Sequence, residues 1–158
     1  MSERSSAADG RRYLVSQIPV FGSWPEDIGI PGEPFCLLLL CDDEVPEAQQ
    51  VETFASRALR QGMLYLSVWG SYSEWVEDLV DQVYEEAIIA GELNSRLLVT
   101  TAHSDLDEAV TFFEHDVRPA EDAKGNLWWV VSVGDDAAIE IATRRLEARH
   151  RVGRLSLT

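Results

Sequence analysis

Four continuous apolar runs constrain the fold of this chain more than any other feature. They cover residues 35–41, 63–69, 97–102 and 127–133, and their starts are about thirty residues apart, the length of one strand and one helix. None of the runs alternates cleanly between apolar and polar residues, so we expect both faces of each strand to be covered. Runs of this kind are typical of a parallel sheet with helices on each side.

The segments between the runs carry apolar residues at helical spacing. A broad apolar face extends over residues 75–88, and we expect Trp75, at its start, to pack in the core. Ser104 or Asp105 is placed to cap the helix that follows the third run, and Asp136 the helix that follows the fourth. Because strand and helix alternate four times, we predict a doubly wound, flavodoxin- or Rossmann-like α/β domain. Its sheet should be mainly parallel, with four to five strands and helices on both faces.

We divide the chain into four parts. Residues 1–12 are predicted to be a disordered tail, 13–34 an N-terminal strand and a Pro/Gly-rich arm, 35–150 the α/β domain, and 151–158 a C-terminal tail that is either a short strand or irregular. The strand near residue 13 could lie antiparallel at an edge of the sheet. A loop as long as the arm is either functional or draped over the fold, and we favour draping, with Trp24 anchoring the arm.

The chain has 158 residues and a formal net charge of −15. Such a charge favours solubility and opposes binding to phosphate backbones or anionic lipid, so we expect no nucleic-acid and no membrane partner. No apolar run approaches the roughly 18 residues of a membrane helix, and we expect a cytoplasmic protein. Lys124 is the only lysine beside many arginines, a bias typical of a GC-rich bacterial genome. The charge reverses from residue 144 onward, where five arginines stand against one glutamate.

Two cysteines, Cys36 and Cys41, lie five positions apart in one predicted strand. They should therefore point to opposite faces and remain unpaired. Two thiols without a Cys/His cluster make no zinc site, and we expect both to be buried and inert.

The predicted strands end in polar residues, and parallel strands place those ends at one edge of the sheet. The candidate ligand or metal residues at this edge are Asp42, Asp43, His103, Asp105 and Asp135. Carboxylate oxygens are suitable ligands for Mg²⁺, and a histidine there is placed for proton transfer. Asp residues just before helices also serve as caps without any ligand. We favour the capping role and expect no cofactor. If these residues instead form a metal site, we expect the metal to be Mg²⁺.

The acidic pair Asp42 and Asp43 resembles that of phosphoacceptor receiver domains. The receiver pattern also requires a lysine at the end of a fifth strand, whereas Lys124 precedes the fourth run, so a working receiver is not expected. The chain has no Gly-rich phosphate loop and no Gly-x-Ser-x-Gly nucleophile turn.

The densest charge in the chain lies on the predicted helix 74–86, which follows a pair of aromatic residues. The candidate partner surface consists of Trp69, Tyr72, Glu74, Glu77, Asp78, Asp81 and Glu85. Our first hypothesis is a non-catalytic binding or regulatory protein, similar in general character to immunity proteins and adaptors, that meets a basic protein partner through this surface. The alternative is a Mg²⁺-dependent phosphoryl-transfer or hydrolytic enzyme using the strand-end carboxylates. A third hypothesis is homo-oligomerisation, with the arginine-rich end of one chain on the acidic helix of another.

Overall fold

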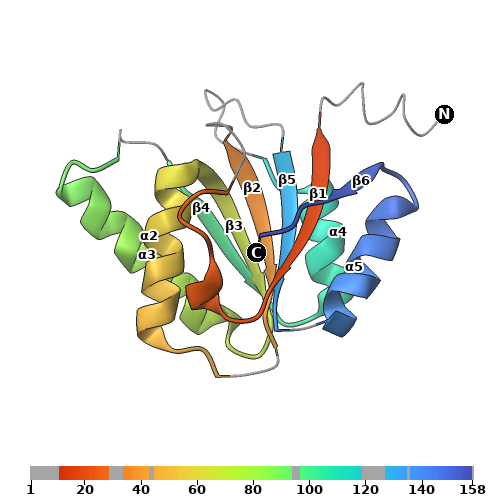
Figure 1. Cartoon of the computed structure of the whole chain (residues 1–158), viewed down its shortest axis with the longest axis horizontal. Helices are drawn as coiled ribbons and strands as arrows, with labels where there is room; N and C mark the ends of the chain where they lie inside the picture. The colour runs from red at the N-terminus through yellow and green to blue at the C-terminus, as the bar shows by residue number, and fades with distance from the viewer. Residues whose placement is uncertain are drawn as a thin grey trace.

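A six-stranded sheet with every strand parallel forms the centre of the molecule (Figure 1). The computed structural model describes residues 11–28, 34–42, 45–93, 97–118, 127–134 and 136–157. The elements in chain order are β1 Arg12–Ile18, the 3₁₀ turn η1 Phe21–Ser23, β2 Phe35–Leu40, α2 Ala48–Gln61, β3 Met63–Trp69, α3 Ser73–Ile89, β4 Val99–His103, α4 Leu106–His115, β5 Leu127–Val133, α5 Asp136–Glu147 and β6 Val152–Arg154. The predicted α/β class is confirmed, with one more strand than the upper expectation.

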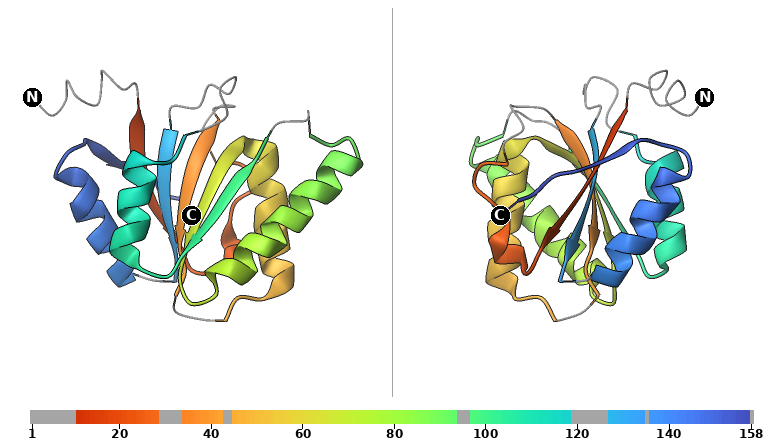
Figure 2. Two further views of the ribbon diagram at one scale, coloured as in Figure 1. Left: turned by 180° about the vertical axis from the view of Figure 1, so that it is seen from behind. Right: turned by 45° about the vertical axis from the view of Figure 1, so that its right-hand side comes forward.

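The helices cover both faces of the sheet (Figure 2). Buried residues of η1, α2 and α3 pack on one face, and those of α4 and α5 pack on the other. Neighbouring residues of a strand alternate between these layers, so that Trp129 and Cys41 lie in the first layer while Trp128 and Cys36 lie in the second. Both cysteines are buried and neither forms a disulfide, as predicted.

The order of the strands across the sheet is β4-β3-β2-β5-β1-β6. From β2 the chain builds outward through β3 to β4, then crosses back to place β5 on the other side of β2. The direction of winding therefore reverses between β2 and β5. In doubly wound sheets this reversal marks the place where the connections diverge and leave a crevice.

The strand β1 lies inside the sheet and parallel to its neighbours, so an antiparallel edge position is wrong. It pairs with β5 along its whole length and with β6 on the other side. The short β6 covers the outer edge of β1, and the chain beyond it is tied back by hydrogen bonds from Leu155 N–H to the Val15 carbonyl and from the Ser16 hydroxyl to the Leu155 carbonyl. These contacts remove β1 from the edge.

The described part of the arm, residues 19–28 and 34, is anchored by Trp24, as predicted. The Trp24 side chain is fully buried and its Nε1–H donates to Gln61 Oε1 at 2.7 Å. Its ring packs against Phe35, Phe54 and Trp129. Arg57 of α2 donates to the Trp24 carbonyl at 2.6 Å. The arm is thus part of the core layer beside α2.

The expected core position of Trp75 is wrong, because 40% of its surface is exposed. The fully buried stripe of α3 is narrower than the apolar pattern suggests and is centred on Val76 and Val80. The helix packs near the β4 side of the sheet and contacts α2 along one face only (Figure 1). An apolar residue at the margin of that face therefore reaches solvent.

Candidate functional site

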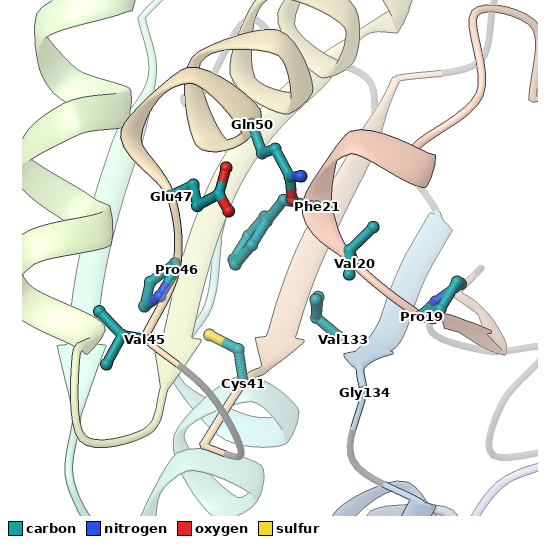
Figure 3. A pocket seen from close by; sticks show the side chains of 10 residues that line it. All are labelled: Pro19, Val20, Phe21, Cys41, Val45, Pro46, Glu47, Gln50, Val133 and Gly134. Atoms are coloured by element: carbon teal, nitrogen blue, oxygen red, sulfur yellow. The ribbon is translucent and has the colours of Figure 1, made fainter.

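A pocket of about 150 Å³ occupies the crevice where the winding of the sheet reverses (Figure 3). The chain leaves β2 toward α2 on one face and leaves β5 toward α5 on the other, so the two connections part at this point. The lining comes from the β1–η1 segment, the end of β2, the start of α2 and the end of β5: Pro19, Val20, Phe21, Cys41, Val45, Pro46, Glu47, Gln50, Val133 and Gly134. Three segments far apart in the sequence therefore build one cavity.

The wall that comes from the β1–η1 segment is held rigidly. Gly134 donates its N–H to the Ile18 carbonyl at 2.9 Å, which ties the end of β5 to the end of β1. Gly134 has a φ of 70°, and a Cβ there would lie 3.1 Å from the Pro19 carbonyl oxygen. Glycine suits this position because it adopts positive φ without strain. These contacts fix the position of this wall relative to the end of β5.

The chemistry of the pocket is an apolar floor with a polar rim. Phe21, Cys41 and Val133 are buried. Glu47 and Gln50 supply a carboxylate and an amide, and Figure 3 shows both side chains on the Phe21 side of α2. The Gln50 side chain lies close to Gly22, where an added Cβ would sit 3.4 Å from it. Within the described part of the lining there is no Arg, Lys or His, and the one formal charge there is the negative charge of Glu47.

Asp42, at the end of β2, holds the neighbouring loop. Its carboxylate accepts hydrogen bonds from the Ser71 N–H at 2.6 Å and from the Ser71 hydroxyl at 2.7 Å. The two loops approach closely beside this contact, since a Cβ at Gly70 would lie 2.0 Å from the Cys41 carbonyl oxygen. Asp42 therefore ties the end of β2 to the β3–α3 loop through Ser71.

His103 and Asp105 lie at the end of β4, which is separated from β2 by β3. The His103 ring is buried, with Nε2 3.1 Å from Thr101 Oγ1 and Nδ1 3.6 Å from Glu108 Oε1. Asp105 is the N-cap of α4 and accepts the Glu108 N–H at 3.0 Å. The predicted capping role of Asp105 is confirmed.

Two of the predicted site residues, Asp43 and Asp135, lie outside the described residues. Within the part of the chain that the structure describes, no group of three or more His, Cys, Asp or Glu side chains is arranged to hold a metal ion. Asp42 is brought near the pocket by β2, whereas His103 and Asp105 belong to the far side of β3.

The predicted partner surface on α3 divides into two faces. Glu74, Asp78 and Glu85 are exposed, together with Tyr72 and Trp75.

Glu77 and Asp81 instead turn toward β4. The Thr100 hydroxyl donates to the Asp81 carboxylate at 2.9 Å. Partial burial raises the pKa of Asp81 and of Glu77 above their ordinary values, although hydrogen bonds from Thr100 oppose the rise. Trp69, at the end of β3, is half-buried, and its indole Nε1 has no hydrogen-bond partner among the described residues.

Sequence reasoning missed the pocket and its residues, including Phe21, Glu47, Gln50 and Val133. The strand-end rule pointed to the edge of the sheet at which the pocket lies. It did not identify β2 and β5 as neighbours, because that pairing joins segments far apart in the chain. For the wall that the β1–η1 segment contributes, the only sequence signal was the unusual length of the arm with its prolines and glycines.

Comparison with known protein families gives one match, which covers most of these elements. A family model described as a domain of unknown function, DUF7684, matches residues 24–149. The chain belongs to this family. The DUF7684 match includes the parts of the pocket contributed by β2, α2 and β5, while the lining residues Pro19, Val20 and Phe21 precede it. No curated protein and no solved structure matched the chain. Among the described helices, none is long and apolar enough to cross a membrane.

Proposed function

We propose that this DUF7684 protein is a non-catalytic binding or regulatory protein of the bacterial cytoplasm that meets a basic protein partner through the exposed face of α3. The observation that carries the proposal is the combination of exposed aromatic and acidic side chains on that face. Tyr72 is 38% and Trp75 is 40% exposed, and Glu74 and Asp78 flank the tryptophan on the same helix. Trp and Tyr are enriched among the residues that dominate binding energy at protein interfaces.

The charges of α3 work against the stability of the isolated helix. The segment Ser73–Ile89 contains six acidic residues and no basic residue. Acidic pairs four residues apart, such as Glu74 with Asp78, repel each other by a few tenths of a kcal/mol. Glu85 and Glu86 also lie toward the C-terminal end, where the helix dipole disfavours negative charge. A cationic partner would offset both effects, which is the energetic argument for its presence.

The partner that this surface fits is a basic segment with at least one arginine. A guanidinium group can stack on an exposed indole and bind a neighbouring carboxylate at the same time. Ile89, which is 86% exposed at the end of α3, adds an apolar contact at the opposite end of the helix. This charge complementarity supports an immunity-like or adaptor-like role, in which the protein acts by occupying a basic surface.

The hydrolytic or phosphoryl-transfer alternative has less support. Asp42 and Asp105 already accept hydrogen bonds from backbone N–H groups, and these contacts give each an ordinary structural role. Calorimetric titration with millimolar Mg²⁺ distinguishes the alternatives. A heat signal that Asp42→Asn abolishes would favour the enzyme over the binding protein.

The test of the proposal compares two variants with the same change in net charge. One carries Glu74→Gln, Asp78→Asn and Glu85→Gln on α3, and the control carries substitutions of three exposed acids on other helices: Glu52→Gln, Glu140→Gln and Glu147→Gln. We expect the wild type and the control to retain a host protein on an affinity column, and the α3 variant to lose it. Calorimetry with that purified protein should show weaker binding as salt rises. Equal affinity for wild type and α3 variant would overturn the proposal.

Self-association is measured in the same series. Arg144 and Arg145 of α5 and Arg149 just beyond it gather on the opposite face of the sheet from α3. Contact between these surfaces would be head-to-tail, which yields rings or open chains rather than a symmetric dimer. Sedimentation velocity at low and high salt decides this: salt-sensitive oligomers would identify a second copy as the basic partner.

A further inference from the structure

We propose that the pocket between the ends of β2 and β5 binds a small organic amine, with the apolar body of the amine over Phe21 and its ammonium group beside Glu47. The proposal is independent of the α3 surface and goes beyond it. It assigns a ligand class to a site defined by Pro19, Val20, Phe21, Cys41, Val45, Pro46, Glu47, Gln50, Val133 and Gly134.

The position of the pocket is the first argument. In doubly wound sheets, ligands bind beyond the carboxyl ends of the strands at the point where the strand order reverses. Here that point lies between β2 and β5. The residues Cys41 and Val133 stand at the ends of those two strands, and both line the cavity.

The rigidity of the walls is the second argument. The segment that carries Phe21 is fixed by hydrogen bonds from the Ser23 N–H to the Val20 carbonyl and from the Trp24 N–H to the Phe21 carbonyl. Trp24 in turn is buried and bound to α2 through Gln61. A pocket that exists before binding requires little ordering of the protein, so more of the contact energy appears as affinity.

The size of the pocket limits the ligand. A dry cavity of about 150 Å³ accommodates one benzene-sized molecule, and the volume here is about 150 Å³. The apolar floor of Phe21, Val133 and Cys41 suits a compact ring or branched chain. A full nucleotide is too large for this space.

The charge of the lining decides the polarity of the ligand. Among the lining residues that the structure describes, Glu47 supplies the one carboxylate, and none has a cationic side chain that could hold a phosphate or carboxylate group. The Glu47 side chain makes no capping hydrogen bond to α2, and Figure 3 shows its carboxylate on the pocket side near Gln50. The amide oxygen of Gln50 is a second acceptor. An ammonium group carries three N–H donors and no acceptor, which matches these two oxygens.

Three probes of similar size separate the contributions. Benzylamine, benzyl alcohol and benzoate share one ring and differ in charge. We expect benzylamine to bind in the millimolar range, and benzoate to bind most weakly. Because Glu47 is exposed to solvent, its ion pair should strengthen benzylamine binding over benzyl alcohol by about two- to fivefold.

The variant Glu47→Gln and its control locate the charge effect. Glu47→Gln should remove the preference for benzylamine and leave the affinity for benzyl alcohol unchanged. Glu52→Gln, an exposed acid further along α2, should preserve the preference. Titrations followed by two-dimensional ¹H–¹⁵N NMR give both the affinity and the place of binding.

The site of the spectral changes makes the test decisive. Shifts concentrated at the amides of Val20, Val45 and Gly134 would support the pocket. Shifts confined to α3, equal affinity for the three probes, or a preference that Glu47→Gln leaves intact would each overturn the proposal. The failure of the α3 proposal would not affect this result, since no α3 residue lines the pocket.

Discussion

Replacing Trp24 with alanine tests whether the arm is part of the core. Trp24 is fully buried, its ring packs against Phe35, Phe54 and Trp129, and its indole donates to Gln61 at 2.7 Å. Truncating a buried Trp to Ala typically costs about 3–5 kcal/mol, because apolar burial is lost and a cavity remains. That loss is a large fraction of the 5–15 kcal/mol that stabilises an ordinary domain.

The matched control is the same substitution at an exposed tryptophan. Trp75→Ala removes a side chain that is 40% exposed, and alanine has the higher helix propensity, so we expect a loss of about 1 kcal/mol or less. For a chain of this size, the Trp24→Ala loss corresponds to a fall in Tm of about 6–20 °C.

Urea unfolding followed by far-UV circular dichroism measures both variants without depending on tryptophan fluorescence. The expected result is a much lower midpoint for Trp24→Ala than for Trp75→Ala, at similar slope. A loss for Trp24→Ala no larger than that for Trp75→Ala would refute the reasoning, because the arm would then contribute nothing to the packed core.

Three further predictions concern the backbone, pH and thiol reactivity. Gly70→Ala should lower the free energy of unfolding by more than about 2 kcal/mol, since the added Cβ would lie 2.0 Å from a carbonyl oxygen. Gly91 has a φ of 74° and open space around an added Cβ, so Gly91→Ala should cost only about 1 kcal/mol. Equal costs of the two substitutions in urea titrations would contradict this. Burial raises the pKa of Asp81, so the folded state holds its proton more tightly and the stability of the wild type falls as pH rises above the ordinary carboxyl pKa. The difference in stability between Asp81→Asn and the wild type should therefore favour the variant more at pH 7 than at pH 4. A difference that does not change with pH in urea titrations would argue against this. Burial raises the pKa of Cys36 to about 12, so in the folded protein this thiol should react with iodoacetamide far more slowly than the thiol of Cys41. Mass spectrometry of the labelled peptides measures the two rates separately. Comparable rates would count against the burial of Cys36.

Much of the fold follows from local sequence patterns. The runs that became β2, β3 and β5 are continuous and apolar because each strand is buried on both faces, and this property is visible without knowing its neighbours. The cap at Asp105 was predictable for a similar reason, since it accepts a hydrogen bond from a residue only three positions away.

The predictions that failed depend on which elements become neighbours. Trp75 lies within an apolar helical pattern, yet its exposure is set by where α3 packs on the sheet. The strand β1 carries the same kind of pattern as an edge strand would, and its interior place results from pairing with β5 and β6.

The candidate site shows the same division. Asp42 was expected at the carboxyl edge, because that expectation requires only the direction of one strand. The pocket was not, because Phe21, Glu47 and Val133 come together only when β5 crosses back to lie beside β2.

The sequence by itself determined the class of the fold, the position of most strands and helices and the acidic character of α3. These properties depend on burial and charge patterns within short segments. Only the tertiary structure decided the order of the strands, the interior place of β1 and the crevice between β2 and β5. Each of these requires pairing between distant segments, whose free energy depends on the packing of the whole sheet rather than on any single stretch of the chain.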